Sequence, residues 1–237
     1  MNVSPNGRTD APDRERALEV IRIEGHDLRS PLANIRSYAS MILARRDALD
    51  PRIRRAAEII VKNADRGLRL IDEWMDLLRS SHARLELART ACPIPALARM
   101  ALSDEQEEFD QKGVRVKTEF DDDLPAVEVD PSRIRRAIAA LLTAARSRAP
   151  EGSTVHLRTR REGDRIRIEV EDEGPRPSRE EADHFYDAEF QMLAHRRMEP
   201  GLEMALARAV AEAHGGEAGA EPVEGGAVHY LDLPLPA

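Results

Sequence analysis

The stretch "GHDLRSPLANIR", residues 25–36, brings together side chains that can carry out nucleophilic chemistry. The neutral imidazole of His26 is a good nucleophile near pH 7 and can accept a phosphoryl group. Asp27 can accept a hydrogen bond from one ring nitrogen, which fixes the tautomer that leaves the other nitrogen free to attack. Ser30 follows one helical turn later. The competing interpretation is an exposed helix that happens to carry one histidine among its polar residues.

Basic residues accompany this stretch at a regular interval. Arg22, Arg29 and Arg36 recur every seven residues, and such a stripe favours an incoming phosphate or an acidic partner surface. Pro31 lies inside the same run. A proline within a helix removes a backbone hydrogen bond, so we expect a local kink just past His26.

Two apolar repeats indicate the elements that hold these residues. In each run the apolar or small residues alternate three and four positions apart, as in a helix of a coiled-coil-like bundle. Asp50 and Pro51 form a cap and first-turn pair between the runs. Two long helices with a short loop make an antiparallel hairpin, which cannot cover both apolar seams alone. We therefore expect two copies to form a four-helix bundle, with His26 beside the seam and facing water. The seam residues are Leu18, Ile21, Gly25, Leu28, Leu32, Ile35, Ala39 and Ile42, then Ile53, Ala57, Ile60, Ala64, Gly67, Ile71, Trp74 and Leu78.

The rest of the chain changes to an α/β pattern. Helical periods occupy residues 93–113, 130–150 and 201–216, and strand alternation occupies 114–120, 153–174 and 227–236. The predicted organisation is a disordered tail over 1–15, a helical hairpin over 16–82 and an α/β domain over 83–237. The fold class is α/β with an all-α part.

Composition excludes several classes of function. The net charge of the 237 residues is -8, which argues against general nucleic-acid binding. Cys92 is the single cysteine, so neither a disulfide framework nor a multi-cysteine metal site is expected. No uncharged apolar run approaches the roughly 20 residues of a membrane helix. We expect a soluble, cytoplasmic protein with no metal site and neither nucleic acid nor membrane as a partner.

The first motif is also recognisable. "HDLRSPLANIRSYASMIL" resembles the H-box of two-component sensor histidine kinases, whose usual form is His-Glu-Leu-Arg-Thr-Pro-Leu followed by an apolar run. Residues 16–82 look like the dimerisation and histidine phosphotransfer hairpin of that family, and residues 83–237 like its ATP-binding domain. The resemblance implies that His26 is the phosphoacceptor.

The second domain departs from the family pattern where a nucleotide would bind. Residues 130–152 resemble the N-box helix, "VEDEGP" the adenine loop and "GLEMALARAVAEAHGG" the second glycine box. Ala144 stands where the family has an asparagine that helps hold Mg²⁺. Arg176 and Glu203 stand at two glycine positions, where bulk and negative charge oppose a phosphate. We expect a degenerate site that needs no cofactor. Asp172, Gly174 and Gly201 would bind a nucleotide only if Mg-ATP is used.

The leading hypothesis is a homodimeric phosphorelay protein that resembles histidine phosphotransferases. His26 would take a phosphoryl group from a response-regulator receiver aspartate and pass it to another, while Asp27 orients the ring and Ser30 reaches the phosphate. Arg22, Arg29 and Arg36 would help dock the receiver, and the C-terminal domain would be a docking surface. Two alternatives stay open: an ATP-dependent autokinase with an atypical nucleotide pocket, and a non-catalytic scaffold that binds a kinase or regulator.

Overall fold

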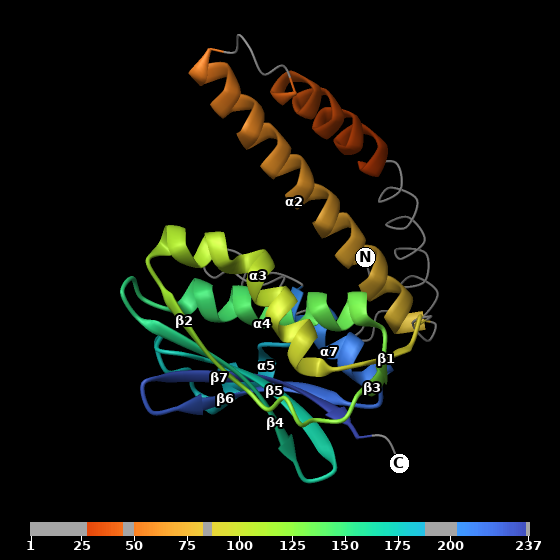
Figure 1. Cartoon of the computed structure of the whole chain (residues 1–237), viewed down its shortest axis with the longest axis vertical. Helices are drawn as coiled ribbons and strands as arrows, with labels where there is room; N and C mark the ends of the chain where they lie inside the picture. Colours follow the sequence, from red (N-terminus) through yellow and green to blue (C-terminus); the bar gives the residue numbers. More distant parts are fainter. Residues whose placement is uncertain (1–27, 45–49, 83–86, 188–202, 236–237) are drawn as a thin grey trace, which may run out of the picture. The chain divides into compact units, whose positions relative to one another are not determined.

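The computed structural model of the chain describes residues 28–44, 50–82, 87–187 and 203–235. The chain divides into two compact units, Met1–His82 and Ala83–Ala237. The described part of the first is helical and the second is an α/β unit, so the predicted fold class is confirmed (Figure 1). The tail predicted over residues 1–15 lies outside the described residues.

The first unit is a hairpin of two helices. Residues 28–43 form the first helix, and α2 (Pro51–His82) forms the second. Its start agrees with the predicted cap, because the Asp50 side chain accepts a hydrogen bond from the Arg52 amide at 2.7 Å. A Cβ added at Gly67 would lie 3.0 Å from the Leu32 side chain. Arg36 pairs with Asp65 at 2.7 Å. Moving from Leu32 to Arg36 along the first helix thus corresponds to moving from Gly67 back to Asp65 along α2, so the two helices are antiparallel.

The predicted apolar seam is only partly buried in this single hairpin. Ala39, Ala57, Ala64 and Ile71 are buried between the helices. Other large apolar side chains remain exposed, among them Ile35 at 48%. The exposed set is Leu28, Ile35, Tyr38, Met41, Ile42, Ile53, Ile59 and Ile60. The single hairpin thus buries three alanines and Ile71 of its seam, and it leaves an isoleucine-rich half exposed, namely Leu28, Ile35, Ile42, Ile53 and Ile60.

The second unit is built around two well-capped helices. Its elements are β1 (Thr90–Cys92), α3 (Ile94–Lys112), β2 (Arg115–Phe120), β3 (Val127–Val129), α4 (Pro131–Arg148), β4 (Thr154–Glu162), β5 (Arg165–Asp172), α5 (Arg179–His184), α7 (Glu203–Ala213), β6 (Glu217–Val223) and β7 (Gly226–Pro234). Gly113 ends α3 at φ 70°, in the left-handed region that glycine tolerates. Asp130 caps α4 by accepting from the amides of Ser132 and Arg133.

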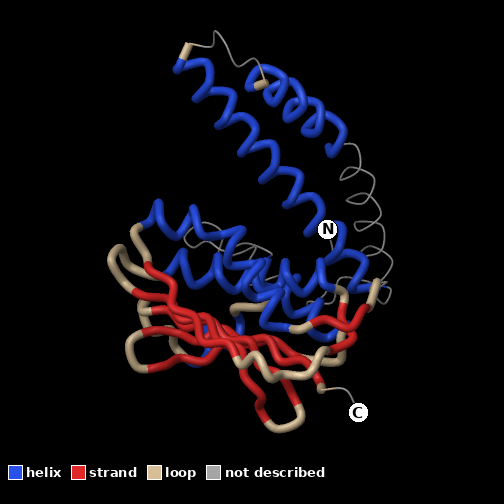
Figure 2. The backbone as a smooth tube through the Cα atoms, in the orientation of Figure 1, coloured by secondary structure: helices blue, strands red, loops and turns tan. Residues whose placement is uncertain are grey.

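A five-stranded sheet and a layer of helices enclose the core. The strand order is β2-β4-β5-β7-β6, with only the β2–β4 pair parallel. Figure 2 shows α3, α4 and α7 on one face of the sheet. Inward-facing residues such as Leu157, Ile168 and Leu231 pack against Ile138 and Leu141 of α4 in one hydrophobic core. This layered core fixes the end of α4 close to the end of β5.

Four elements of the second unit were not expected from the sequence. The short strands β1 and β3 pair with each other apart from the main sheet. Helix α5 has only six residues, and Ser178 and Glu181 start it with a capping box. Strand β6, "EAGAEPV", contains glycine and proline and lies at the sheet edge, where proline is tolerated. Short or composition-poor elements of this kind give little periodic signal.

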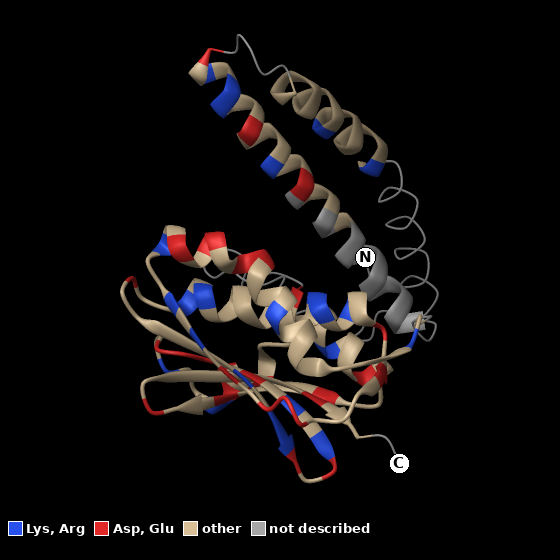
Figure 3. Ribbon diagram, viewed as in Figure 1, with Lys and Arg blue, Asp and Glu red and all other residues tan. Residues whose placement is uncertain are grey.

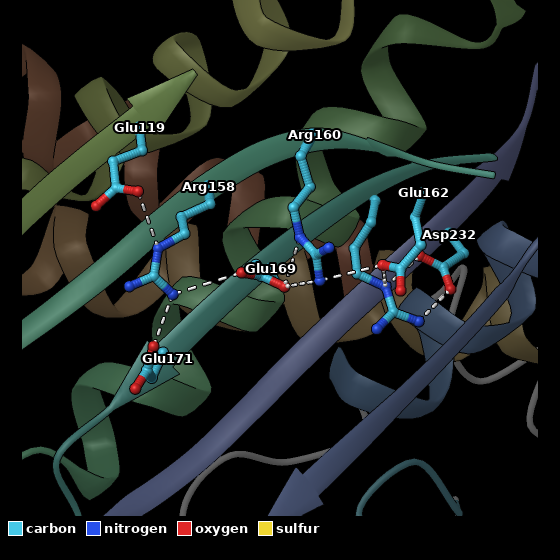
Figure 4. Close-up of polar contacts among 8 residues, drawn as sticks. Glu119, Arg158, Arg160, Glu162, Glu169, Glu171 and Asp232 are labelled. Atoms are coloured by element: carbon cyan, nitrogen blue, oxygen red, sulfur yellow. Dashed lines mark hydrogen bonds and ion pairs between the residues drawn. The ribbon is translucent and has the colours of Figure 1, made fainter. Parts of the chain in front are cut away.

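Charged residues recur along the strands of the sheet (Figure 3), and in β5 they alternate with core residues, which places them on the outer face. Figure 4 shows the ion pairs that link β2, β4, β5 and β7 across this face. Arg158 is paired with Glu171 at 2.6 Å and with Glu119 and Glu169 at 3.4 Å. Arg167 is paired with Asp232 at 2.6 Å. This face is therefore a surface whose opposite charges already satisfy each other.

Candidate functional site

The phosphoacceptor motif is described only in part. His26, Asp27 and Arg22 lie outside the described residues, so their predicted roles stay predictions. Ser30 and Arg29 are exposed on the helix of residues 28–43, which continues through Pro31. Arg36 is also exposed, but its guanidinium is paired with Asp65. It therefore stabilises the hairpin as well as adding to the predicted basic stripe.

The second candidate site is a buried corner where β5 and α4 end. Both oxygens of the Asp172 carboxylate have donors there: the Gly174 amide donates to Oδ1 at 2.7 Å and Arg148 Nε to Oδ2 at 3.1 Å. The Asp172 and Arg148 side chains are 0% and 6% exposed. A Cβ at Gly174 would come within 2.8 Å of the Arg148 carbonyl oxygen, so this close approach requires glycine. The sequence-predicted pair Asp172 and Gly174 is thus brought together, with Arg148 as a third member.

A buried histidine adjoins the same carboxylate. His229 Nε2 lies 3.7 Å from Asp172 Oδ2, and the ring is 1% exposed. Burial, helped by the charge of Arg148, lowers the pKa of His229 to about 3, so the imidazole is neutral at pH 7 and this contact is not an ion pair. Burial also raises the pKa of Asp172 against the opposing pull of Arg148 and the Gly174 amide. Arg148 is therefore the cation that stabilises the buried carboxylate.

The residues of α4 do not fit a bound Mg²⁺. Ala144 is 1% exposed and brings no side-chain oxygen to the position where the resemblance implies a metal-holding asparagine. The nearby Ser147 hydroxyl donates to the Ala144 carbonyl at 2.8 Å. No group of three or more His, Cys, Asp and Glu side chains suited to a metal occurs within the described ranges. The residues at this position of α4 therefore offer Mg²⁺ no side-chain oxygen.

The other two predicted departures are only partly visible. Arg176 is exposed in the loop between β5 and α5, so its side chain does not fill the corner. Glu203 is the first residue of α7, and Gly201 lies outside the described residues. A carboxylate at a helix N-terminus interacts favourably with the helix dipole, and it occupies the place where the same dipole would stabilise an anionic phosphate.

A groove of about 420 Å³ lies between α3 and α4, but its cations are already engaged. Lys112 Nζ donates to the carbonyl oxygens of Arg146 and Ser147, and Arg146 is paired with Glu105 at 2.6 Å. Burial and the charge of Arg146 lower the pKa of Lys112. The groove is lined by Glu108, Gln111, Lys112, Thr143, Arg146 and Ser147.

Two residues of the Asp172 corner, Arg148 and His229, were not singled out from the sequence. The alternation of β7 does place His229 on the inward face together with Ala227 and Leu231, which is a readable signal. The sequence gave no comparable signal for Arg148, because an arginine in the last turn of a helix is common.

Family models match both units of the chain. The phospho-acceptor His Kinase A domain matches residues 12–83, and the histidine kinase-, DNA gyrase B- and HSP90-like ATPase matches residues 129–237. The chain belongs to the two-component histidine kinase family. Both matches agree with the resemblance seen in the sequence.

The similar curated proteins are sensor kinases that are longer than this chain. The alginate biosynthesis sensor protein KinB of Pseudomonas aeruginosa is 30% identical over 236 residues, which cover 93% of this chain and 38% of KinB. The adaptive-response sensory kinase SasA of Gloeothece citriformis is 26% identical, over 92% of this chain and 57% of SasA. The chain therefore spans well under two thirds of the length of these relatives.

Solved histidine kinase structures share the fold. Full-length ShkA, crystallised with AMPPNP, superposes with a TM-score of 0.73 at 22% identity over 91% of this chain and 45% of ShkA. Acinetobacter baumannii AdeS gives 0.62 at 17% identity over 90% of this chain and 98% of AdeS. ThkA in complex with the response regulator TrrA gives 0.61 at 18% identity over 96% and 64%. Within the described ranges of the present chain, no helix has the length and apolarity needed to cross a membrane.

Proposed function

We propose that this chain is a two-component phosphorelay protein whose His26 exchanges a phosphoryl group with response-regulator receiver aspartates. The match of residues 12–83 to a phospho-acceptor domain supports this role for the hairpin. The observation that favours a receiver over ATP as phosphoryl donor is the misfit of the second unit to Mg-ATP, above all the buried Ala144. A protein of this family that cannot use ATP can still accept a phosphoryl group from a partner.

The proposed reaction needs only groups of the hairpin and the receiver. A ring nitrogen of His26 attacks the phosphorus of the receiver aspartyl phosphate, a P–N bond forms, and the P–O bond breaks to release the aspartate carboxylate. Asp27 holds the proton of the other ring nitrogen and so fixes the tautomer. The Ser30 hydroxyl lies one turn on, within reach of the phosphate. Arg22, Arg29 and Arg36 draw in the acidic receiver surface, and the reverse reaction passes the group to a second receiver.

We also propose that the working form is a homodimer. The exposed isoleucine half of the seam, with Ile35 and Ile60 among its residues, forms an apolar stripe on both helices of the hairpin. A second copy would bury this stripe and complete a four-helix bundle. Cytoplasmic location, and the lack of nucleic acid or membrane as a partner, stay predictions.

The experiment that tests the proposal is phosphoryl transfer from a panel of purified, ³²P-labelled receivers. We expect His26→Gln to abolish labelling of the chain, because glutamine keeps size and polarity but has no nucleophilic ring nitrogen. His82→Gln is the matched control and should label like the wild type. Acid-labile, alkali-stable label that persists in His26→Gln would contradict the assignment, and His82 would then be tested as the acceptor.

The autokinase alternative is supported by the ATPase match and by the retained Asp172 and Gly174. Titration calorimetry with Mg-ATP separates the two proposals. We expect binding weaker than about 1 mM, since each lost interaction of about 1.4 kcal/mol weakens binding tenfold. Micromolar binding followed by label on His26 would establish the autokinase instead. A wild-type biological effect of His26→Gln in cells would favour the scaffold alternative over both.

A further inference from the structure

The Asp172 corner is already filled by a group of the chain itself. The Arg148 guanidinium donates to Asp172 Oδ2 and to the Pro175 carbonyl oxygen, and its central carbon lies 5.3 Å from the centre of the Phe185 ring. A planar set of N–H donors is thus held by a buried carboxylate, a backbone carbonyl and an aromatic face. These three partners define what the corner recognises: a flat group that presents N–H donors along its edge.

We infer that Arg148 is the residue that closes this corner to an aminopurine base. An exocyclic amine of a purine would need the same carboxylate oxygen that the guanidinium occupies, and its ring would need the place beside Phe185. This role of Arg148 rests on the proposed loss of nucleotide use, but it concerns recognition of the base and is independent of His26. It adds to the effect of Ala144, which bears only on a metal.

The ion pair between Arg148 and Asp172 is buried and is held at both ends by the core of the unit. Arg148 is the last residue of α4, and Asp172 is the last residue of β5, so the core that packs these elements holds both partners in place. A buried charged pair exchanges for a neutral ligand only if the displaced guanidinium finds another partner for its charge. His229 is neutral at pH 7 beside Arg148, so in the intact corner the guanidinium is the cation that pairs with Asp172.

A purely structural role for the same contact is the competing explanation. In that case Arg148 would only fasten the loop after β5 to the end of α4, and its removal would lower stability without creating a binding site. The two explanations differ in one measurable property, which is a gain of affinity for a nucleoside. Adenosine is the suitable probe, because it has the base but no phosphate and therefore ignores the changes at Ala144 and Glu203.

The test compares adenosine binding by the full chain and its Arg148→Ala variant at pH 8, using calorimetry and the shift of the thermal transition. We expect no binding by the wild type up to several millimolar, and a gain of at least about tenfold in affinity for Arg148→Ala. Arg146→Ala, which removes the Arg146–Glu105 pair from the same helix turn, is the matched control and should gain nothing. N-ethylguanidinium at a few millimolar should compete with adenosine in Arg148→Ala, because it restores the missing planar donor.

Two further variants keep the inference falsifiable. Arg148→Lys retains a cation for Asp172 and therefore guards against loss of the fold. The lysine ammonium is smaller than the planar guanidinium, so we expect a gain of adenosine affinity between those of the wild type and Arg148→Ala. Adding Asp172→Ala to Arg148→Ala should abolish the gain, because the side chain then has no acceptor oxygen. A folded Arg148→Ala and Arg148→Lys that both fail to bind adenosine would overturn the inference, as would equal binding by the wild type. Neither result would change phosphoryl transfer to His26, so failure here is distinguishable from failure of the proposed function.

Discussion

The two units of this chain differ in what they have kept. The hairpin carries the whole predicted acceptor motif, yet of its described seam it buries only three alanines and Ile71, and it exposes Ile35 and Ile60. The second unit has a complete core that includes Phe109, Ile138 and Leu231, yet the positions that would bind Mg-ATP hold an alanine and an arginine-capped carboxylate. A fold depends on many apolar contacts, whereas a nucleotide site depends on a few polar atoms. An intact architecture therefore does not by itself establish a working nucleotide site, and the proposed loss of ATP use concerns only those few atoms.

The largest effect should come from a charge in the exposed apolar stripe. Ile35→Asp would bury an unpaired carboxylate from each copy in the proposed bundle, at a cost of about 3–5 kcal/mol per charge. We expect monomers at micromolar concentration by light scattering, with the thermal transition of the second unit unchanged. Ser40→Asp, which adds the same charge at an exposed position on another side of the helix, is the control. An Ile35→Asp protein that stays dimeric would show that the stripe is not the dimer contact.

In the second unit, the largest loss should follow removal of the carboxylate that starts α4. Asp130 Oδ1 accepts from the Ser132 hydroxyl and from the amides of Ser132 and Arg133, and Oδ2 accepts from the Ala88 amide. Burial would raise the pKa of Asp130, but these hydrogen bonds and the charge of Arg133 outweigh it and lower the pKa. Asp130→Ala should destabilise the unit by about 2–3 kcal/mol in urea unfolding.

Asp130→Asn is the matched variant, because it removes the charge and keeps one acceptor oxygen for the Ser132 and Arg133 amides, while an NH2 group replaces the oxygen that accepts from Ala88. It should lose clearly less than Asp130→Ala. Because the folded-state pKa of Asp130 is depressed, its charge-dependent stabilisation is present above about pH 4 and disappears as the pH falls through the folded pKa. Equal losses in the two variants would mean that the side chain does not act as a cap.

A smaller, pH-dependent effect should come from two buried histidines of the second unit. His214 Nε2 accepts from the Asp130 amide at 2.9 Å while Nδ1 contacts the Val210 carbonyl oxygen at 2.7 Å, which suits the neutral ring. Burial lowers the pKa of both His214 and His229, the latter to about 3. The unfolded chain takes up these protons near pH 6.5 and the folded chain does not, so stability should fall as the pH drops below 6.5.

The size of this acid effect can be measured in matched proteins. For His229 the loss between pH 7.5 and pH 5 should be about 2 kcal/mol, because one pH unit corresponds to 1.36 kcal/mol below the unfolded pKa. His229→Phe should remove that part of the slope in urea unfolding series at the two pH values. A His229→Phe protein that is as acid-sensitive as the wild type would contradict the neutral, buried state of this ring.

Much of the fold could be predicted from the periodicity of the sequence, whereas much of the Asp172 corner could not. The starts of α2 and α4 were predicted because Asp50–Pro51 and Asp130–Pro131 are local signals. The division of the seam into a buried and an exposed half was not, because the helical period marks apolar positions without showing which of them a single hairpin covers. Arg148 was missed for a similar reason: its partner Asp172 is 24 residues away, and only the packing of α4 against β5 brings them together. Local patterns determine elements, while long-range pairs determine the site.

The smallest effect should come from the ion pairs on the outer face of the sheet. Arg160 is 46% exposed and contacts Glu162 and Glu169 at 3.1 Å, so solvent screens both pairs. We expect Arg160→Ala to lower the free energy of unfolding by less than about 1 kcal/mol, and most of this difference should disappear in 0.5 M salt.

Arg167→Ala is the informative comparison, because Arg167 is 16% exposed, meets both oxygens of Asp232 and lies 4.3 Å from the centre of the Tyr230 ring. It should cost about 2 kcal/mol, with little dependence on salt, since its contacts are shielded and include packing. Equal and salt-sensitive losses of stability in the two variants would contradict this and show that all ion pairs on this face are screened alike. The expected difference would mean that burial decides which of these pairs stabilise the sheet.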